Sequence, residues 1–271
     1  MLCISNFIFC QTDTIYKVNG EALYVNVAEI TESSVKYVYP EEDFQNTVNK
    51  KSIAKIHFKS GRKQEFTSPL NLAKVKSCLD WKSVQVSSID AEVSGLYRLD
   101  NVGSKAKGIT TLSSISKLQD RAYNKLKIAT AMLGGNVVYL MSQNTEESIF
   151  GGEESSTKLP SVTISGIAYS SRKIQESEIN FGGYAVSHVF ALRTNEVDIR
   201  HLNVQSQYVS INKEDIKNNN NSLNLKLKIF TLHKVKEYKV IYASSTEIVL
   251  SAVHSTRRGK KTFYNVVLKR S

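Results

Sequence analysis

The stretch TIYKVNGEALYVNV, residues Thr14–Val27, contains two runs of alternating apolar and polar residues on either side of Asn19-Gly20. Alternation with a period of two is typical of a β-strand that buries one face. Asn-Gly between two such runs is a strong hairpin signal, because both residues tolerate the positive φ of a type I′ turn. The sequence therefore predicts antiparallel β-structure near the start of the chain.

The strand-turn-strand pattern continues to Phe66 and predicts a small β-barrel-like module of five or six strands over residues 11–68. The pattern resembles a small β-module at the N-terminus of exported proteins of unknown function in Gram-negative bacteria. That resemblance implies a fold and a compartment, and it implies no activity. The residues that carry it are Asp13, Ile15, Gly20, Val27, Glu29, Ile30, Val35, Tyr37, Ser52, Ile53, Ile56, Phe58, Gly61 and Phe66.

An uncharged apolar run, residues 1–10, precedes the hairpin and is typical of the end of a secretory signal peptide. Cys10 stands where signal peptidase accepts a small residue, so we expect a mature start at Gln11 and a periplasmic or outer-membrane-associated protein. The first basic residue is Lys17, so either the positive region that opens a signal peptide lies upstream of Met1 or this run is not a leader. The alternative is an apolar first strand. Lipid attachment at Cys10 is disfavoured, because bulky Phe9 precedes it.

Residues 69–89 are expected to form a linker, and residues 90–171 a β-α-β-β domain with one helix on a sheet. The predicted strands are Ala91–Leu99, Asn136–Met141 and Ser161–Ser170. The predicted helix lies within Ser113–Asn136 and ends at Gly134 or Gly135. Its apolar residues advance by three or four positions, at Ile115, Leu118, Ala122, Leu126, Ala129, Met132 and Leu133.

The runs A-x-A-x-x-L-G-G-N-V-V and V-x-I-S-G-x-A-Y in this segment resemble a family of small bacterial α+β domains. One branch of that family is called heavy-metal-binding-like, and others are envelope lipoproteins of unknown function. The metal-binding property does not carry over, because residues 90–170 contain neither His nor Cys.

Residues 180–271 predict an antiparallel β-sandwich or barrel-like sheet, with the Asn-rich stretch Asn212–Ser222 as a loop. The expected strands are Tyr184–Leu192, Glu196–Val204, Ser222–Leu232, Glu237–Ala243, Thr246–His254 and Lys261–Arg270. The fold class as a whole is mainly β with one α+β module. The sequence has no run of 18 apolar residues, so it predicts no membrane-spanning helix.

No catalytic, metal or cofactor motif stands out in the sequence. A P-loop, a G-x-G-x-x-G run and a G-x-S-x-G elbow are absent, and none of the five histidines has a ligand at metal-binding spacing. Cys78 is the one cysteine outside the N-terminal run, and no base for it is evident. We therefore expect a protein without catalytic residues, bound metal or cofactor.

The charge is concentrated at the C-terminus, where the last fifty residues carry a net +9 of the total +11. The densest cluster is a predicted hairpin tip of Arg257, Arg258, Lys260 and Lys261. We expect this tip to bind an anionic surface, such as lipid headgroups or lipopolysaccharide, or an acidic envelope protein. The alternative is single-stranded nucleic acid, with bases stacked on Phe230, Tyr238, Tyr242, Phe263 or Tyr264.

Overall fold

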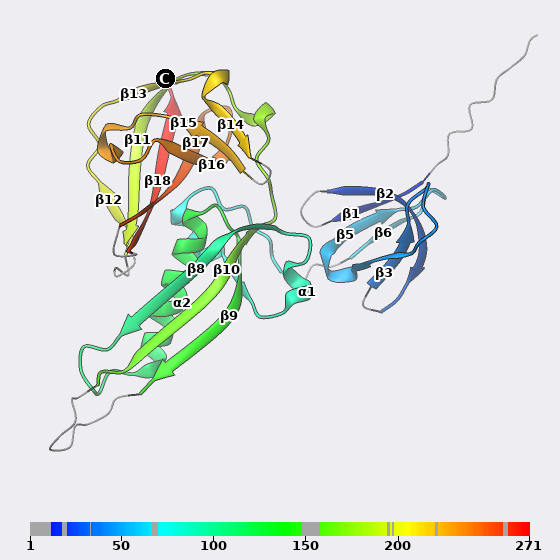
Figure 1. Ribbon diagram of the computed structural model, residues 1–271, viewed down its shortest axis with the longest axis horizontal. Coiled ribbons are helices and arrows are strands. Elements are labelled where there is room, and N and C mark those ends of the chain that lie inside the picture. Colours follow the sequence, from blue (N-terminus) through cyan, green and yellow to red (C-terminus); the bar gives the residue numbers. More distant parts are fainter. Residues whose placement is uncertain are drawn as a thin grey trace, which may run out of the picture. The chain divides into compact units, whose positions relative to one another are not determined.

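The computed structural model describes residues 12–17, 21–32, 34–66, 70–147, 158–193, 196, 198–219, 222–256 and 260–271, apart from the side chains of Lys51 and Asn219. The protein is mainly β, as the sequence predicts, and the described residues form three sheets (Figure 1). The chain divides into two compact units. The N-terminal unit extends to Leu70 and includes Ala91–Leu96, and the C-terminal unit comprises Asn71–Asp90 and Tyr97–Ser271. Residues 1–11 and the predicted Asn19-Gly20 turn lie outside the described residues.

The N-terminal unit is a six-stranded antiparallel sheet with the strand order β4-β3-β2-β1-β5-β6. Its described strands do not close into a barrel. A 3₁₀-helix, Lys50–Ser52, precedes β5. The strands are β1 (Asp13–Lys17), β2 (Ala22–Ile30), β3 (Ser34–Val38), β4 (Asn46–Asn49), β5 (Ile53–His57) and β6 (Lys63–Glu65).

The alternating apolar residues of these strands form the core of the N-terminal unit, in which Ile15, Val25 and Ile56 are fully buried. The carboxylate of Asp13 is also buried, and it accepts hydrogen bonds of 2.8 Å from the backbone N–H groups of Val27 and Lys59. The side chain thereby joins strand β2 to the segment after β5. A buried carboxylate needs such donors to offset the loss of water.

The C-terminal unit contains a four-stranded sheet with the order β7-β9-β10-β8, along which α2 packs (Figure 1). The predicted β-α-β-β order is present in β8, α2, β9 and β10. A 3₁₀-helix, Cys78–Ser83, also packs on α2. The elements are β7 (Gln85–Ser87), β8 (Tyr97–Lys107), α2 (Ile115–Met132), β9 (Val137–Glu146) and β10 (Ser161–Ser170).

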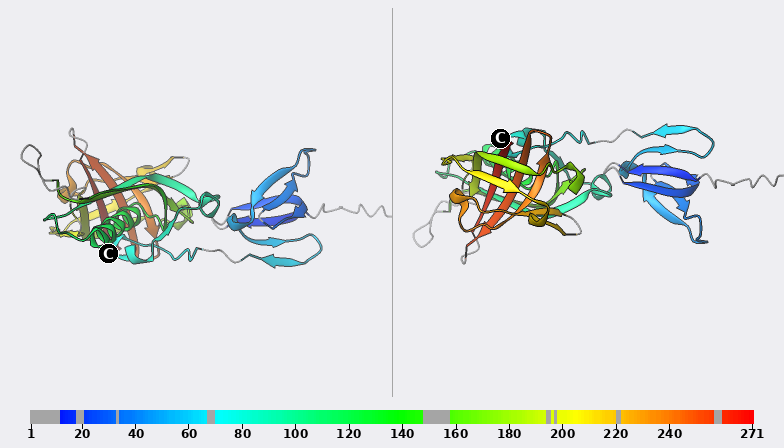
Figure 2. Two further views of the ribbon diagram at one scale, coloured as in Figure 1. Left: turned by 90° about the horizontal axis from the view of Figure 1, so that it is seen from below. Right: turned by 90° about the horizontal axis from the view of Figure 1, so that it is seen from above.

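The second sheet of this unit is curved and has the order β12-β11-β18-β17-β16-β15-β14, with β13 paired to β11 (Figure 2). Short 3₁₀-helices at Glu176–Glu178, Lys213–Asp215 and Phe230–Leu232 connect its strands. The strands are β11 (Gly182–Arg193), β12 (Arg200–Leu202), β13 (Tyr208–Ile211), β14 (Ile216–Asn219), β15 (Ser222–Lys226), β16 (Glu237–Ala243), β17 (Glu247–Ser255) and β18 (Lys261–Arg270).

Two local predictions are wrong. The stretch Ala91–Leu99 is not one strand, because the helix α1 (Asp90–Val93) and a turn at Gly95, with φ of +84°, precede β8. The loop predicted at Asn212–Ser222 contains β14, which pairs with β15 in antiparallel register. At a sheet edge, backbone hydrogen bonds from the neighbouring strand support residues of low strand propensity.

One hydrophobic cluster, here called the shared core, is common to the two sheets of the C-terminal unit. It combines Leu126 of α2 and Val138 of β9 with Ile241 of β16 and Val267 of β18. The last turn of α2 approaches β16 so closely that a Cβ atom on Gly134 would lie 2.7 Å from the Cβ of Ile241. Gly134 also has a φ of +80°, so both its backbone and its surroundings require glycine.

Asn265 on β18 has a buried polar side chain that forms hydrogen bonds to two other segments of the C-terminal unit. Its Nδ2 donates to the carbonyl of Met132 at 2.8 Å, and its Oδ1 accepts from the backbone N–H of Cys78 at 2.8 Å. Asn265 is fully buried. The contacts connect the eight-stranded sheet to the end of α2 and to the first turn of the 3₁₀-helix Cys78–Ser83.

Candidate functional site

The predicted basic tip lies on the β17–β18 hairpin. Arg257 and Arg258 are outside the described residues, and Lys260 is exposed. Lys261 begins β18, pairs in register with Ser255, and is half-buried. The two described lysines therefore differ in their surroundings, and Lys261 borders a cavity.

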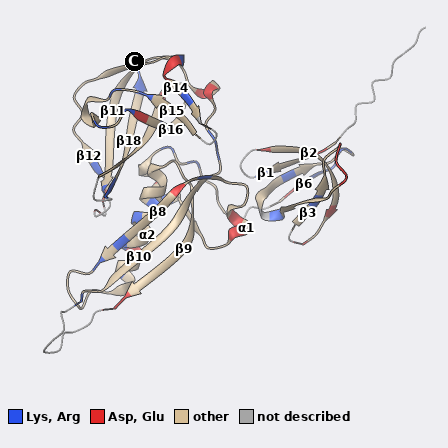
Figure 3. Cartoon of the chain, viewed as in Figure 1, with Lys and Arg blue, Asp and Glu red and all other residues tan. Residues whose placement is uncertain are grey.

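This cavity, here called the basic cavity, has a volume of about 420 Å³ and carries four cationic side chains. They come from four elements: Lys105 from β8, Lys125 from α2, Arg193 from β11 and Lys261 from β18. Figure 3 shows the lysines and arginines of the chain in blue, including those along β8. Among the described residues that line the cavity, none is acidic.

The wall of the basic cavity is largely apolar. It is lined by five residues that are largely buried and belong to the shared core: Val102, Ala129, Ile164, Leu192 and Phe263. Cavities of this size with an apolar lining and a few placed polar groups are typical of small-molecule sites. The arrangement suits a ligand with an apolar body and an anionic end.

Lys125 is the least exposed of the four cations, with 3% of its surface accessible. Burial lowers the pKa of its ammonium group, and the nearby carboxylate of Glu196 opposes that shift. Glu196 also pairs with Arg193 at 3.5 Å and with Arg200 at 2.5 Å. The carboxylate of Glu196 therefore lies near Lys125 and pairs with both arginines.

The sequence did not lead us to predict Lys105, Lys125 or Arg193 as binding residues. Lys125 carried a detectable signal, because it lies three residues after Ala122 and four before Ala129 on the apolar face of the helix. A lysine on such a face is either paired or functional. Lys105 and Arg193 gave no local signal, since they belong to different sheets and border one cavity only in the folded unit.

Cys78 and the histidines are the other described side chains that the sequence offered for chemistry. Cys78 is fully buried, and burial raises the pKa of its thiol to about 12, which removes the thiolate needed for nucleophilic attack. The rings of His188 and His201 lie 5.3 Å apart across the β11–β12 pair, a proximity that the sequence spacing does not reveal. Within the described ranges, no three His, Cys, Asp or Glu side chains gather as metal ligands would.

No known protein family, curated protein or solved structure matches this chain. Among the described helices, none is long and apolar enough to cross a membrane.

Proposed function

We propose that the protein is a non-enzymatic binding protein of the cell envelope that takes an anionic amphiphile, such as an anionic lipid, into the basic cavity. The observation that carries this proposal is the apolar cavity with Lys105, Lys125, Arg193 and Lys261 around it. The cations attract the charged end of the ligand, and the apolar wall takes up part of its chain. Lys261 of the basic tip lines the cavity, and in this proposal the tip meets the surface from which the ligand comes.

The alternative of single-stranded nucleic acid has less support. Stacking on bases requires exposed aromatic faces, whereas Tyr238, Tyr242 and Phe263 are all buried. Of the five aromatic residues that could stack, Phe230 is the one that is largely exposed. The apolar wall of the basic cavity would also remain unused by a phosphate backbone.

Changing Arg257, Arg258, Lys260 and Lys261 together to Gln is expected to weaken retention on anionic vesicles at low salt. A cation near an anionic membrane contributes about 1 kcal/mol, which corresponds to about a fivefold change in binding per residue. The measurement is co-sedimentation with vesicles of an anionic lipid, alongside vesicles of a zwitterionic lipid. Salt at 1 M should abolish the difference, because screening there falls to about 3 Å.

A matched control carries four Gln substitutions at exposed lysines away from the hairpin, namely Lys117, Lys226, Lys234 and Lys236. This variant has the same net charge as the tip variant and should retain most of the binding. Equal loss in both variants would mean that total charge, and no particular surface, is responsible. Preference for single-stranded DNA over vesicles at physiological salt would favour the alternative.

The cavity itself is tested with a soluble alkyl phosphate and the corresponding alkyl alcohol. We expect saturable binding of the phosphate and weak binding of the alcohol, and the double variant Lys105→Gln/Lys261→Gln should weaken only the former. If the alcohol binds equally well, the cations do not select the ligand.

Export to the envelope is the second part of the proposal. It is supported by the uncharged apolar run before the first strand and by the resemblance of residues 11–68 to modules of exported proteins. We expect the mature protein to begin at or near Gln11 and to fractionate with the periplasm or the outer membrane. N-terminal sequencing of the fractionated protein checks this, and a cytoplasmic product that retains Met1 would contradict it.

A further inference from the structure

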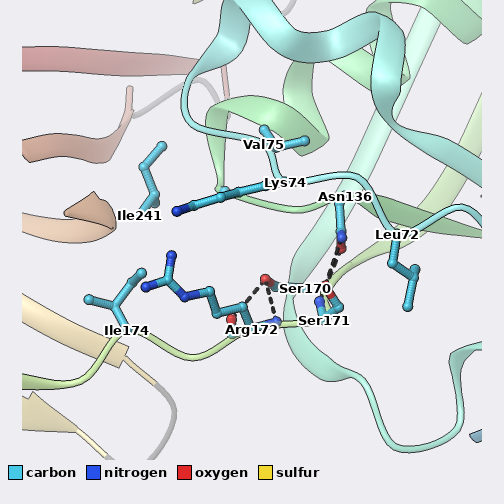
Figure 4. Close-up of a pocket in the computed structure, with 10 residues that line it drawn as sticks. Leu72, Lys74, Val75, Asn136, Ser170, Ser171, Arg172, Ile174 and Ile241 are labelled. Carbon is cyan, nitrogen blue, oxygen red and sulfur yellow. Dashed lines mark hydrogen bonds between the residues drawn. The ribbon is translucent and has the colours of Figure 1, made fainter. Parts of the chain in front are cut away.

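A second cavity, here called the Lys74–Arg172 cleft, lies where the last turn of α2 meets β16 (Figure 4). Its volume is about 330 Å³, and it shares no lining residue with the basic cavity. The lining residues are Leu72, Lys74, Val75, Gly134, Asn136, Ser170, Ser171, Arg172, Ile174 and Ile241.

Two cationic side chains enter this cleft from separate segments of the chain. Lys74 precedes the 3₁₀-helix Cys78–Ser83, and Arg172 follows β10. Figure 4 shows both side chains reaching toward the same part of the cleft, beside Ile174 and Ile241. Among the described lining residues there is no Asp or Glu to separate the two cations. Two converging cations without an acid between them favour an anion between them.

The positions of the two segments are fixed by Asn136, whose side chain is buried. Its Nδ2 donates to the carbonyl of Ala73 at 3.1 Å and to the Oγ of Ser171 at 2.8 Å. Its Oδ1 accepts from the backbone N–H of Ser171 at 3.0 Å. The residues next to Lys74 and Arg172 are thereby tied together, so folding supplies much of the ordering that binding would otherwise require.

The cationic groups are also oriented by contacts of their own. The ammonium group of Lys74 lies 4.5 Å from the ring centroid of Tyr242, and Arg172 pairs with Glu178. A guanidinium has five N–H donors in a planar fork, and one carboxylate does not use them all. Arg172 therefore keeps donors for a second anion while Glu178 holds its orientation.

The neighbouring hollow adds two further cationic side chains, Lys173 and Lys239. It shares Arg172 and Ile241 with the cleft and is also lined by Lys239 of β16. Burial lowers the pKa of Lys239 to about 8, and the nearby carboxylate of Asp100 opposes this shift. A partly desolvated lysine beside a cleft is common at binding sites.

We infer that the Lys74–Arg172 cleft is a second anion site, which binds a compact phosphate group as inorganic phosphate or as a phosphomonoester. Lys74 and Arg172 contact the phosphate oxygens, and the hydroxyl groups of Ser170 and Ser171 border the same space. A phosphate carries several acceptor oxygens, which match a lysine and an arginine converging from two sides. The site is independent of the amphiphile cavity and of the envelope assignment.

The test is calorimetric titration of the whole protein with inorganic phosphate, at an ionic strength held constant with chloride. We expect saturable binding that the double variant Lys74→Gln/Arg172→Gln weakens at least about tenfold, because charge-assisted hydrogen bonds are lost. The control Lys82→Gln should bind as the parent does. Lys82 is exposed, lines neither cavity, and also lies over an aromatic ring, that of Trp81.

Phenyl phosphate in a parallel titration distinguishes the two sources of the phosphate group. Tighter binding of phenyl phosphate indicates a monoester whose substituent lies on Ile174 and Ile241, and tighter binding of phosphate indicates the free ion. The inference is overturned if the double variant binds phosphate as well as the parent, or if phosphate shows no saturable binding. Should the double variant fail to fold, the single variant Lys74→Gln gives the same reading.

The two sites are distinguished by measuring how each double variant binds the ligand of the other site. Lys105→Gln/Lys261→Gln should leave inorganic phosphate binding unchanged. An alkyl phosphate is itself a phosphomonoester and also occupies the cleft, so Lys74→Gln/Arg172→Gln should leave unchanged only the part of alkyl phosphate binding that Lys105→Gln/Lys261→Gln removes. If either double variant loses both inorganic phosphate binding and alkyl phosphate binding, the two cavities form one continuous site, and the inference of a separate site fails.

Discussion

Replacing Asn265 with leucine is expected to lower the free energy of unfolding of the C-terminal unit by about 2–6 kcal/mol. Leucine has a similar size, so the loss does not come from a void. It comes from the carbonyl of Met132 and the N–H of Cys78, which both lose their 2.8 Å partner in a buried place. A buried backbone group without a partner costs about 1–3 kcal/mol, and two such groups are affected.

The measurement is urea unfolding followed by the fluorescence of Trp81, the single tryptophan of the chain. Trp81 packs against the shared core, so its signal reports on the C-terminal unit. The control is Asn203→Leu at an exposed loop position, which should change the free energy by less than about 0.5 kcal/mol. An unfolding midpoint for Asn265→Leu equal to that of the parent would show that other groups replace these hydrogen bonds.

Replacing Leu126 with alanine is expected to cost about 2–5 kcal/mol, the range for removing a buried leucine from a packed core. Leu126 has no accessible surface, and it belongs to the cluster that joins α2 to both sheets of the unit. Residues from several packed elements surround Leu126, so they would not move easily to fill the void that alanine leaves. The cost should therefore fall in the upper part of this range.

The matched control for Leu126→Ala is Asn124→Ala, two residues earlier on the exposed side of the same helix. Alanine is the better helix former by several tenths of a kcal/mol, so this variant should be neutral or slightly more stable. The same Trp81 unfolding curves compare the two. Equal midpoints for both variants would mean that the helix buries a different face.

Much of the secondary structure could be predicted from the sequence, because strand alternation and helix periodicity are local. In Ser222–Leu232, for example, Leu223, Leu225, Leu227 and Ile229 are all buried, as their alternation predicts. The strand β15 nevertheless ends at Lys226, because the register with its partner β16 ends there. Strand ends depend on the neighbouring strand, which a single run of residues does not reveal.

The shared core could not be predicted, because it depends on contacts between distant parts of the chain. Asn265 illustrates the difficulty. A polar residue inside the apolar run of β18 was visible in the sequence, yet its partners Met132 and Cys78 lie far away along the chain. The cations of the basic cavity are similar, since Lys105 and Lys261 belong to different sheets and border one cavity only in the folded unit.

The position of β18 has a consequence for how the protein folds. Among the described strands it comes latest in the sequence, yet it lies between β11 and β17 and pairs with both. Until β18 takes its place, β11 and β17 each present an unpaired edge that favours aggregation. The pairing of Val189 with Val266 also requires a long loop to close, which slows folding. The eight-stranded sheet is thus completed only when β18 inserts, and the partly folded C-terminal unit is open to aggregation until that step.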